Sequence, residues 1–151
     1  MMQNTKNRVP RHTDAATNRE IQTHTRERVL RVVRGGATAI DQRLKELDAE
    51  WDVERVLETN AATAVLVGVA LGRFVDRRFY AMPAIVGGFL LQHALQGWCP
   101  PLPVFRRMGF RTADEINEER YALKTLRGDF VGLASREDAT AALLALEAAR
   151  T

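Results

Sequence analysis

Residues 60–98 read NAATAVLVGVALGRFVDRRFYAMPAIVGGFLLQHALQGW, and their charge pattern sets the fold class of the chain. Arg73 is the only charged residue between positions 61 and 75, and positions 79–105 carry no charge. Between the two apolar runs stands a short charged segment with Arg73, Asp76, Arg77 and Arg78. Two apolar runs joined by a tight basic turn are typical of a helical hairpin whose turn lies at a membrane face.

The lengths of the two runs leave more than one interpretation open. As a helix, the first run rises about 22 Å, which is short of the roughly 30 Å hydrocarbon core of a bilayer. The second run is nearer this length but contains Pro83, Gln92 and His93. Hydropathy alone therefore fits a transmembrane hairpin, a re-entrant segment, or the buried core hairpin of a soluble helical bundle.

Small residues recur at four-residue spacing in both runs and favour the membrane interpretation. The predicted helix-packing residues are Ala64, Gly68, Gly72, Ala84, Gly88 and Gln92. In water each glycine weakens a helix by up to about 1 kcal/mol. In lipid the same glycines let helices approach closely, and an amide side chain hydrogen-bonds across the contact. In a soluble bundle the glycines would only permit tight packing.

The second run ends in a set of stop and anchor signals. Gly97 is expected to end the helix, and the prolines at 100, 101 and 103 prevent it from resuming. An amphipathic indole followed by arginines is typical of a membrane–water boundary. The predicted interface anchors are Trp98, Arg73, Arg77, Arg78, Arg106 and Arg107.

Cys99 is the only cysteine, which excludes a disulfide within the chain and the usual multi-cysteine zinc sites. Three interpretations remain. Cys99 packs as a small hydrophobe beneath Trp98; or it accepts a sulfane sulfur as a thiolate favoured by Arg106 and Arg107; or it binds a metal or haem together with His93. No catalytic set, metal site or cofactor is predicted. His93 is expected to be a polar contact between helices.

The residues before position 60 are polar. Residues 1–23 lack the apolar core of a signal peptide. This segment is expected to be a disordered basic tail. Residues 24–59 are expected to form a cytoplasmic helix pair, in which a basic helix ends at Gly35 and an acidic helix starts at a capping box of Thr38 and Asp41. The basic helix either lies on an anionic membrane surface or docks on its acidic neighbour. The seam of the acidic helix for a partner consists of Ile40, Leu44, Leu47 and Trp51.

Residues 111–151 are expected to form two short C-terminal helices. The first has a capping box of Thr112 and Glu115 and closes at Gly128. The second has a capping box of Ser135 and Asp138. Its apolar residues, which would pair with a second copy or pack on the acidic helix, are Leu143, Leu144 and Leu146.

The segment GWCPPLPVFRRMGFRTADEINEERYALKTLRGDF at residues 97–130, placed straight after the apolar hairpin, resembles an uncharacterised family of small bacterial inner-membrane proteins. That family is similar to the transmembrane domain of membrane-anchored rhodaneses. The resemblance covers about residues 55–130, and its most specific element is the turn at residues 97–100. It implies a dimeric pair of transmembrane helices with both termini in the cytoplasm. The 151 residues include neither a rhodanese domain nor a second cysteine, so sulfur transfer is not carried over.

The sequence therefore predicts an all-α protein in which residues 60–110 form a two-helix transmembrane hairpin, flanked by short cytoplasmic amphipathic helices. The expected function is a non-enzymatic, oligomerising or scaffolding hairpin of the bacterial inner membrane, whose partners are the lipid bilayer and a second copy. One alternative is a sulfur-handling or redox accessory that works through Cys99 with a separate rhodanese-like protein. Another is a soluble helical bundle. The sequence pI of about 9.5 alone does not predict nucleic-acid binding, because no recognisable reader motif accompanies it.

Overall fold

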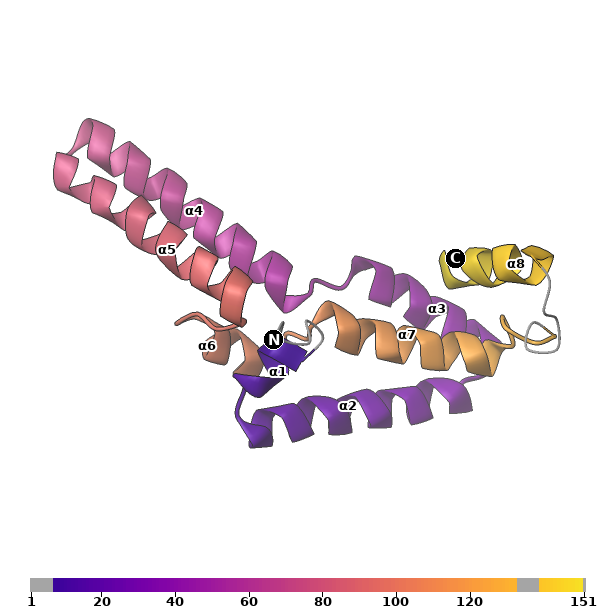
Figure 1. Ribbon diagram of the computed structural model, residues 1–151. Coiled ribbons are helices and arrows are strands. Elements are labelled where there is room, and N and C mark those ends of the chain that lie inside the picture. The colour runs from indigo at the N-terminus through magenta and orange to yellow at the C-terminus, as the bar shows by residue number, and fades with distance from the viewer. Residues whose placement is uncertain (1–6, 133–138, 151) are drawn as a thin grey trace. The chain divides into compact units, whose positions relative to one another are not determined.

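The computed structural model of the chain describes residues 7–132 and 139–150, and Figure 1 shows its helices. Every regular element in these ranges is helical, so the predicted all-α class is confirmed for them. Two compact units are present: one joins the described residues up to Ile21 with Trp51–Ala113, and the other joins Gln22–Glu50 with the described residues from Asp114 onward. The elements are α1 (Arg8–Arg11), α2 (Ala15–Arg34), α3 (Gly36–Ala49), α4 (Val53–Phe74), the 3-10 helix η2 (Arg77–Tyr80), α5 (Ala81–Gln96), α6 (Leu102–Arg107), α7 (Ala113–Arg127) and α8 (Ala139–Arg150).

Helices α4 and α5 form the predicted hairpin and run antiparallel side by side (Figure 1). At the turn, the Asp76 carboxylate accepts a hydrogen bond of 2.8 Å from the backbone N–H of Arg78 and starts η2. Helix α5 ends where Gly97 adopts a φ of 80°, and the Gly97 N–H donates to the His93 carbonyl at 2.7 Å. The basic turn and the stop at Gly97 are therefore confirmed.

The closest approach between the two arms is made possible by two glycines of α4. A Cβ added at Gly68 would lie 2.6 Å from Pro83 Cδ, and one added at Gly72 would lie 2.8 Å from the Tyr80 ring. These distances are far below van der Waals contact, so only glycine fits there without a shift. The small residues of α5 are placed differently: Gly88 is exposed and has nothing within 4 Å of an added Cβ. The second half of the expected stripe therefore does not face α4.

The core of the hairpin unit corrects the prediction of a disordered tail over residues 1–23. Its buried cluster consists of Val9, Val53, Leu57, Cys99 and Leu102. The side chain of Asp14 caps α2 by accepting bonds from the backbone N–H groups of Ala16 and Thr17 at 3.0 and 2.9 Å. Residues 8–11 and 15–23 of this segment are helical, and Val9 covers a core built from residues far along the chain.

The core of the second unit confirms most of the predicted seam. Its buried cluster consists of Ile40, Leu44, Leu47, Ile116 and Leu123. Val29 and Val32 of α2 pack against this cluster, so the basic helix docks on its acidic neighbour. Trp51 is wrongly assigned to the seam, since it is 42% exposed and its ring lies 4.2 Å from the Arg55 guanidinium. The capping box at Thr38 is also wrong, because α3 already begins at Gly36 and has no side-chain cap.

The negative charges at the end of α3 are neutralised mainly by Arg43 of the same helix. Arg43 contacts Glu46 at 3.1 Å, Glu50 at 3.0 Å and the fully buried Glu119 carboxylate of α7 at 2.8 Å. Arg28 of the basic helix adds a 3.3 Å contact to Glu119. The hydrogen bond from Arg43 lowers the pKa of the exposed Glu46 carboxyl below its ordinary value. Arg43 therefore contributes most of the positive charge around these carboxylates, and Arg28 of the basic helix contributes through Glu119.

The C-terminal helices agree with the sequence where they are described. Helix α7 begins directly after Thr112 and ends directly before Gly128, as predicted. Lys124 Nζ donates to the Ala148 and Ala149 carbonyls of α8 at 3.0 and 3.1 Å. The predicted capping box of Ser135 and Asp138 lies outside the described residues. The leucines of α8 are exposed within this unit.

Among the described residues, one segment is long and apolar enough to cross a membrane by length and composition alone. This segment is Gly36–Phe74, which α3 and α4 make up with a break at residues 50–52. Helix α5 has 16 residues and rises about 24 Å, so it falls short of the same criterion. A hairpin is therefore present, whereas two full spans are not shown.

We expect Gly68→Ala to open or strain the hairpin, because the new methyl group meets the Pro83 ring and not a flexible chain end. Overpacking of this kind costs about 1–3 kcal/mol. Gly87→Ala is the matched control, since nothing lies within 4 Å of its added Cβ and alanine favours a helix by up to about 1 kcal/mol. Thermal unfolding in detergent followed by circular dichroism measures both variants. Equal melting temperatures for the two would contradict the assigned contact.

Candidate functional site

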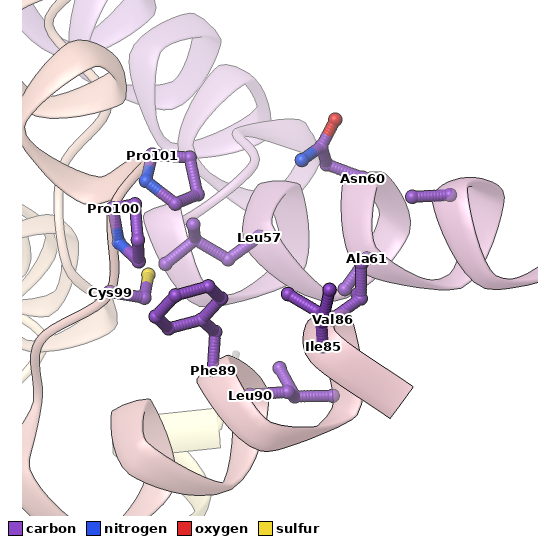
Figure 2. Close-up of a pocket in the computed structure, with 11 residues that line it drawn as sticks. Leu57, Asn60, Ala61, Ile85, Val86, Phe89, Leu90, Cys99, Pro100 and Pro101 are labelled. Atoms are coloured by element: carbon purple, nitrogen blue, oxygen red, sulfur yellow. The ribbon is translucent and has the colours of Figure 1, made fainter. Parts of the chain in front are cut away.

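An apolar cavity of about 500 Å³ lies between the two arms of the hairpin, at the end away from the basic turn. Figure 2 shows the side chains that line it, with the sulfur of Cys99 close to Leu57 and Phe89. Asn60 is its one polar side chain, and Ala64 of the predicted packing set is also part of the wall. Such a cavity suits an apolar group and offers no charged residue to a polar substrate.

Cys99 is built into this wall and is not presented to solvent. The residue is 4% exposed, and its carbonyl accepts a bond of 3.1 Å from the backbone N–H of Leu102. Burial raises the pKa of the Cys99 thiol above its ordinary value, and the Leu102 backbone N–H, which also faces the sulfur, offsets only part of this shift. A raised pKa disfavours the thiolate, which is the nucleophilic form.

The two arginines expected to favour a Cys99 thiolate are engaged elsewhere. Arg106 is fully buried and donates to Thr13 Oγ1 at 3.2 Å, to the Phe110 carbonyl at 2.9 Å and to Asn18 Oδ1 at 3.1 Å. Arg107 is exposed, and its Nε lies 3.9 Å from the Asp14 carboxylate. Neither arginine is among the causes that shift the pKa of Cys99, which burial raises.

The other predicted anchors divide into two groups. Arg73, Arg77 and Arg78 are exposed around the hairpin turn, as a membrane-face turn requires. Trp98 is half-buried beside Cys99. The prediction of Arg106 as a surface anchor is wrong, because this side chain is buried and its hydrogen bonds connect α6 to Thr13 and to Asn18 of α2.

The predicted packing residues also divide. Gly68 and Gly72 are buried at the contact of α4 with α5 and η2, and Gln92 is half-buried. Ala84 and Gly88 are exposed on the outer side of α5. These two residues leave part of the α5 backbone open for contact with another molecule.

His93 and Cys99 do not share a site. His93 lines a second cavity of about 260 Å³ together with Arg8, Glu54 and Glu58, and Cys99 is not part of that wall. In the described ranges, no group of three or more His, Cys, Asp or Glu side chains is arranged to hold a metal ion. The structure therefore brings together no pair of ligands from Cys99 and His93.

Two groups of functional interest have no local signal in the sequence. Arg8 reaches the end of α5, where its Nη1 donates to the Ala94 carbonyl at 2.8 Å. Glu54 reads as an ordinary first-turn acid of a helix, but its Oε2 atom is buried. Arg8 and Glu54 line one cavity because the fold brings Arg8 to Ala94, 86 residues further along the chain.

Comparisons with protein-family models, with curated proteins and with solved structures give no match for this chain.

We expect Cys99 to react with N-ethylmaleimide at least about tenfold more slowly than an exposed thiol, because access and thiolate formation are both restricted. The reference is Val104→Cys in a Cys99→Ser background, since Val104 of α6 is exposed. Because its pKa is raised, the Cys99 rate keeps rising to a higher pH than the reference rate does. Stopped reactions analysed by mass spectrometry give both rates. Equal rates, or a persulfide at Cys99 after polysulfide loading, would favour sulfur chemistry instead.

Proposed function

We propose that the protein is a membrane-inserted helical hairpin that has no catalytic role and associates with a second copy through the outer face of α5. The observation that carries this proposal is the exposure of large apolar side chains along both arms. Soluble monomers rarely expose contiguous apolar surface of this extent. The exposed apolar residues of the arms are Leu66, Val67, Val69, Phe74, Val75, Phe79, Tyr80, Ile85, Phe89, Leu90, Leu91 and Leu95.

The distribution of charge agrees with lipid around these residues. The exposed apolar side chains fall within the runs 61–75 and 79–95, where Arg73 is the only charge. The arginines at the turn bound the apolar zone at one end, and the charges of Glu54 and Glu58 bound it at the other. Leu66, for example, is 71% exposed. Transfer of such a side chain from water to lipid is favourable by a free energy of about 25 cal/mol per Å² of apolar surface.

Helical length supports insertion of the second arm despite the shortness of α5. Residues 79 and 80 of η2 extend the helical path before α5 begins. With a rise of about 2.0 Å per 3-10 residue and 1.5 Å per α residue, residues 79–96 cover about 28 Å. This is close to the roughly 30 Å of a hydrocarbon core.

Self-association is supported by the part of α5 that α4 leaves uncovered. Position 88 has nothing within 4 Å of an added Cβ, and Ala84 lies one turn earlier on the same face of α5. Small residues four apart on a lipid-facing surface let two helices approach closely. The proposed partner is therefore a second copy of the hairpin.

The proposed location follows from the resemblance of residues 55–130 to small bacterial inner-membrane proteins. In this proposal both termini lie in the cytoplasm and the basic turn lies at the opposite membrane face. Sulfur transfer to Cys99 from a rhodanese-like partner is not included, because the buried thiol has a raised pKa and an apolar surrounding.

We expect the purified chain to float with vesicles of phosphatidylcholine and phosphatidylglycerol and to resist extraction at alkaline pH. Leu66→Arg places a charge midway along the first arm, which costs about 2.5–3.5 kcal/mol of insertion free energy on biological scales. The variant should therefore float less or be extracted, as measured by density-gradient centrifugation.

The control for this experiment is Leu126→Arg, since Leu126 of α7 is 57% exposed but lies in the other unit. It should float like the wild type. A monodisperse, folded wild-type chain in plain buffer that fails to float would overturn the membrane proposal and favour the soluble bundle.

We expect Gly88→Leu to weaken dimers in detergent micelles, because a side chain on this face holds the two backbones apart. The cost should be about 1–3 kcal/mol, as for overpacking elsewhere. Gly87→Leu makes the same chemical change about 100° around the helix and should leave association nearly unchanged. Sedimentation equilibrium gives the dissociation constants. A wild-type chain that stays monomeric across the accessible concentration range would contradict the self-association proposal.

A further inference from the structure

The base of the hairpin contains a polar cavity that the membrane proposal does not explain. It lies between the first turn of α4 and the last turn of α5 and has a volume of about 260 Å³. Its polar lining consists of Arg8, Glu54, Glu58 and His93, and its apolar lining includes Leu57 and Leu90. Two carboxylates, one guanidinium and one imidazole thus face a single small space.

His93 contributes two buried nitrogen atoms without hydrogen-bond partners to this cavity, as far as the described residues show. The residue is 6% exposed, and neither ring nitrogen has a hydrogen-bond partner in the described part of the chain. A buried polar group left unpaired costs about 1–3 kcal/mol, so a residue in this state is a candidate for binding.

Glu54 presents a second such atom to the same space. Its Oε2 is buried and has no hydrogen-bond partner among the described residues. Burial, with a smaller contribution from Asp52, raises the pKa of the Glu54 carboxyl, and a backbone hydrogen bond with the charges of Arg8 and Arg106 compensates its charged form only in part. A cationic hydrogen-bond donor would supply that compensation.

The arrangement of donors and acceptors defines the complementary ligand. Glu54 Oε2, the Glu58 carboxylate and one nitrogen of a neutral imidazole accept hydrogen bonds, which matches the three N–H donors of a primary ammonium. The other imidazole nitrogen and the Arg8 guanidinium are donors, which suits an anionic oxygen close to that ammonium. Arg8 is held in place by its bond of 2.8 Å to the Ala94 carbonyl. The matching ligand is a small zwitterion that carries an ammonium and an anionic oxygen group such as a phosphate.

The position of the cavity indicates where such a zwitterion comes from. His93 lies in the last turn of α5, just before Trp98, and Glu54 and Glu58 precede the apolar run of α4. If the hairpin is inserted as proposed above, the cavity lies at headgroup depth. Exposed Leu91 and Leu95 on the same end of α5 offer apolar surface to acyl chains.

We propose that this cavity binds the headgroup of phosphatidylethanolamine, with the ammonium against Glu54 and His93 and the phosphate at Arg8. The proposal rests on membrane insertion of the hairpin, but the chemistry of the cavity is independent of it. Phosphatidylcholine has the same phosphate and the same net charge but no N–H donors. The cavity should therefore discriminate between the two lipids.

In the test, the full-length chain in mild-detergent micelles is mixed with equal amounts of phosphatidylethanolamine and phosphatidylcholine that have identical acyl chains. Native mass spectrometry counts the retained lipids. We expect phosphatidylethanolamine to be retained about tenfold more, the effect of one charge-assisted hydrogen bond. Glu54→Gln and His93→Leu should abolish the preference. The control is Glu118→Gln, which changes an exposed carboxylate of α7 in the same way and should retain the preference for phosphatidylethanolamine.

A third variant covers the case in which Glu54→Gln or His93→Leu lowers the helix content. Glu58→Gln alters an exposed carboxylate at the cavity wall and should reduce the preference without unfolding. Equal retention of the two lipids by a folded wild-type chain would overturn the proposal. So would a preference that survives in all three variants.

A separate arm distinguishes the lipid from a soluble zwitterion and separates this proposal from the membrane proposal. Free phosphoethanolamine and free phosphocholine are added to the chain as competitors. If free phosphoethanolamine alone binds in a Glu54-dependent way and the chain does not float with vesicles, the assignment to lipid is overturned together with insertion. If the chain floats but shows no preference for either ammonium, only the headgroup proposal fails.

Discussion

The structure of the hairpin unit depends on the contact between α4 and the start of the second arm. Gly68 and Gly72 leave room for the Pro83 ring and the Tyr80 ring, which approach the α4 backbone more closely than any Cβ would allow. This close approach sets where α5 runs along α4. Because the arms are antiparallel, it also brings the last turn of α5 to the first turn of α4, where the polar cavity lies. The apolar cavity adjoins it, between residues 57–64 of α4 and residues 85–90 of α5.

The base of the hairpin is in turn fixed by long-range contacts. Val9 closes the core over Leu57 and Cys99, and Arg8 bonds the end of α5. Gly97 allows this because a Cβ there would lie 2.8 Å from Arg8, and its φ of 80° suits glycine. Arg106 binds Thr13 and Asn18 from within the same core. Cys99 is thus surrounded on the core side and faces an apolar cavity on the other, and this burial raises the pKa of its thiol.

The sequence predicted the parts of the fold that depend on local patterns. The seam of Ile40, Leu44 and Leu47, the glycine ends of α5 and α7, and the basic turn all follow from periodicity and capping, which act within a few residues. The errors lie where distant residues decide the outcome. A single Val9 in a polar segment carries no periodic signal, yet a core 40 or more residues away buries it.

The candidate site was predicted less completely for the same reason. Cys99 was identified because it is unique, but its environment is set by Leu57 and Phe89 from two different helices. Arg106 looked like a surface anchor by its place after a proline-rich turn, whereas the folded chain uses it as a buried crosslink. Glu54 and His93 are 39 positions apart, so only the antiparallel hairpin makes them neighbours of one cavity.

Leu57 and Leu90 line both cavities, so the apolar space at Cys99 and the polar space at His93 share two walls. A protein that sits wholly in water has little reason to keep an unpaired imidazole and carboxylate oxygen beside an exposed apolar hairpin, since both features cost free energy there. At a membrane interface both costs fall, because lipid covers the apolar arms and a headgroup supplies ammonium donors and phosphate acceptors at the same depth. A zwitterion also leaves the net charge of the cavity unchanged, so binding it adds no new charge to a region next to hydrocarbon. The proposed membrane location therefore offers one common explanation for the exposed leucines and the unsatisfied polar atoms.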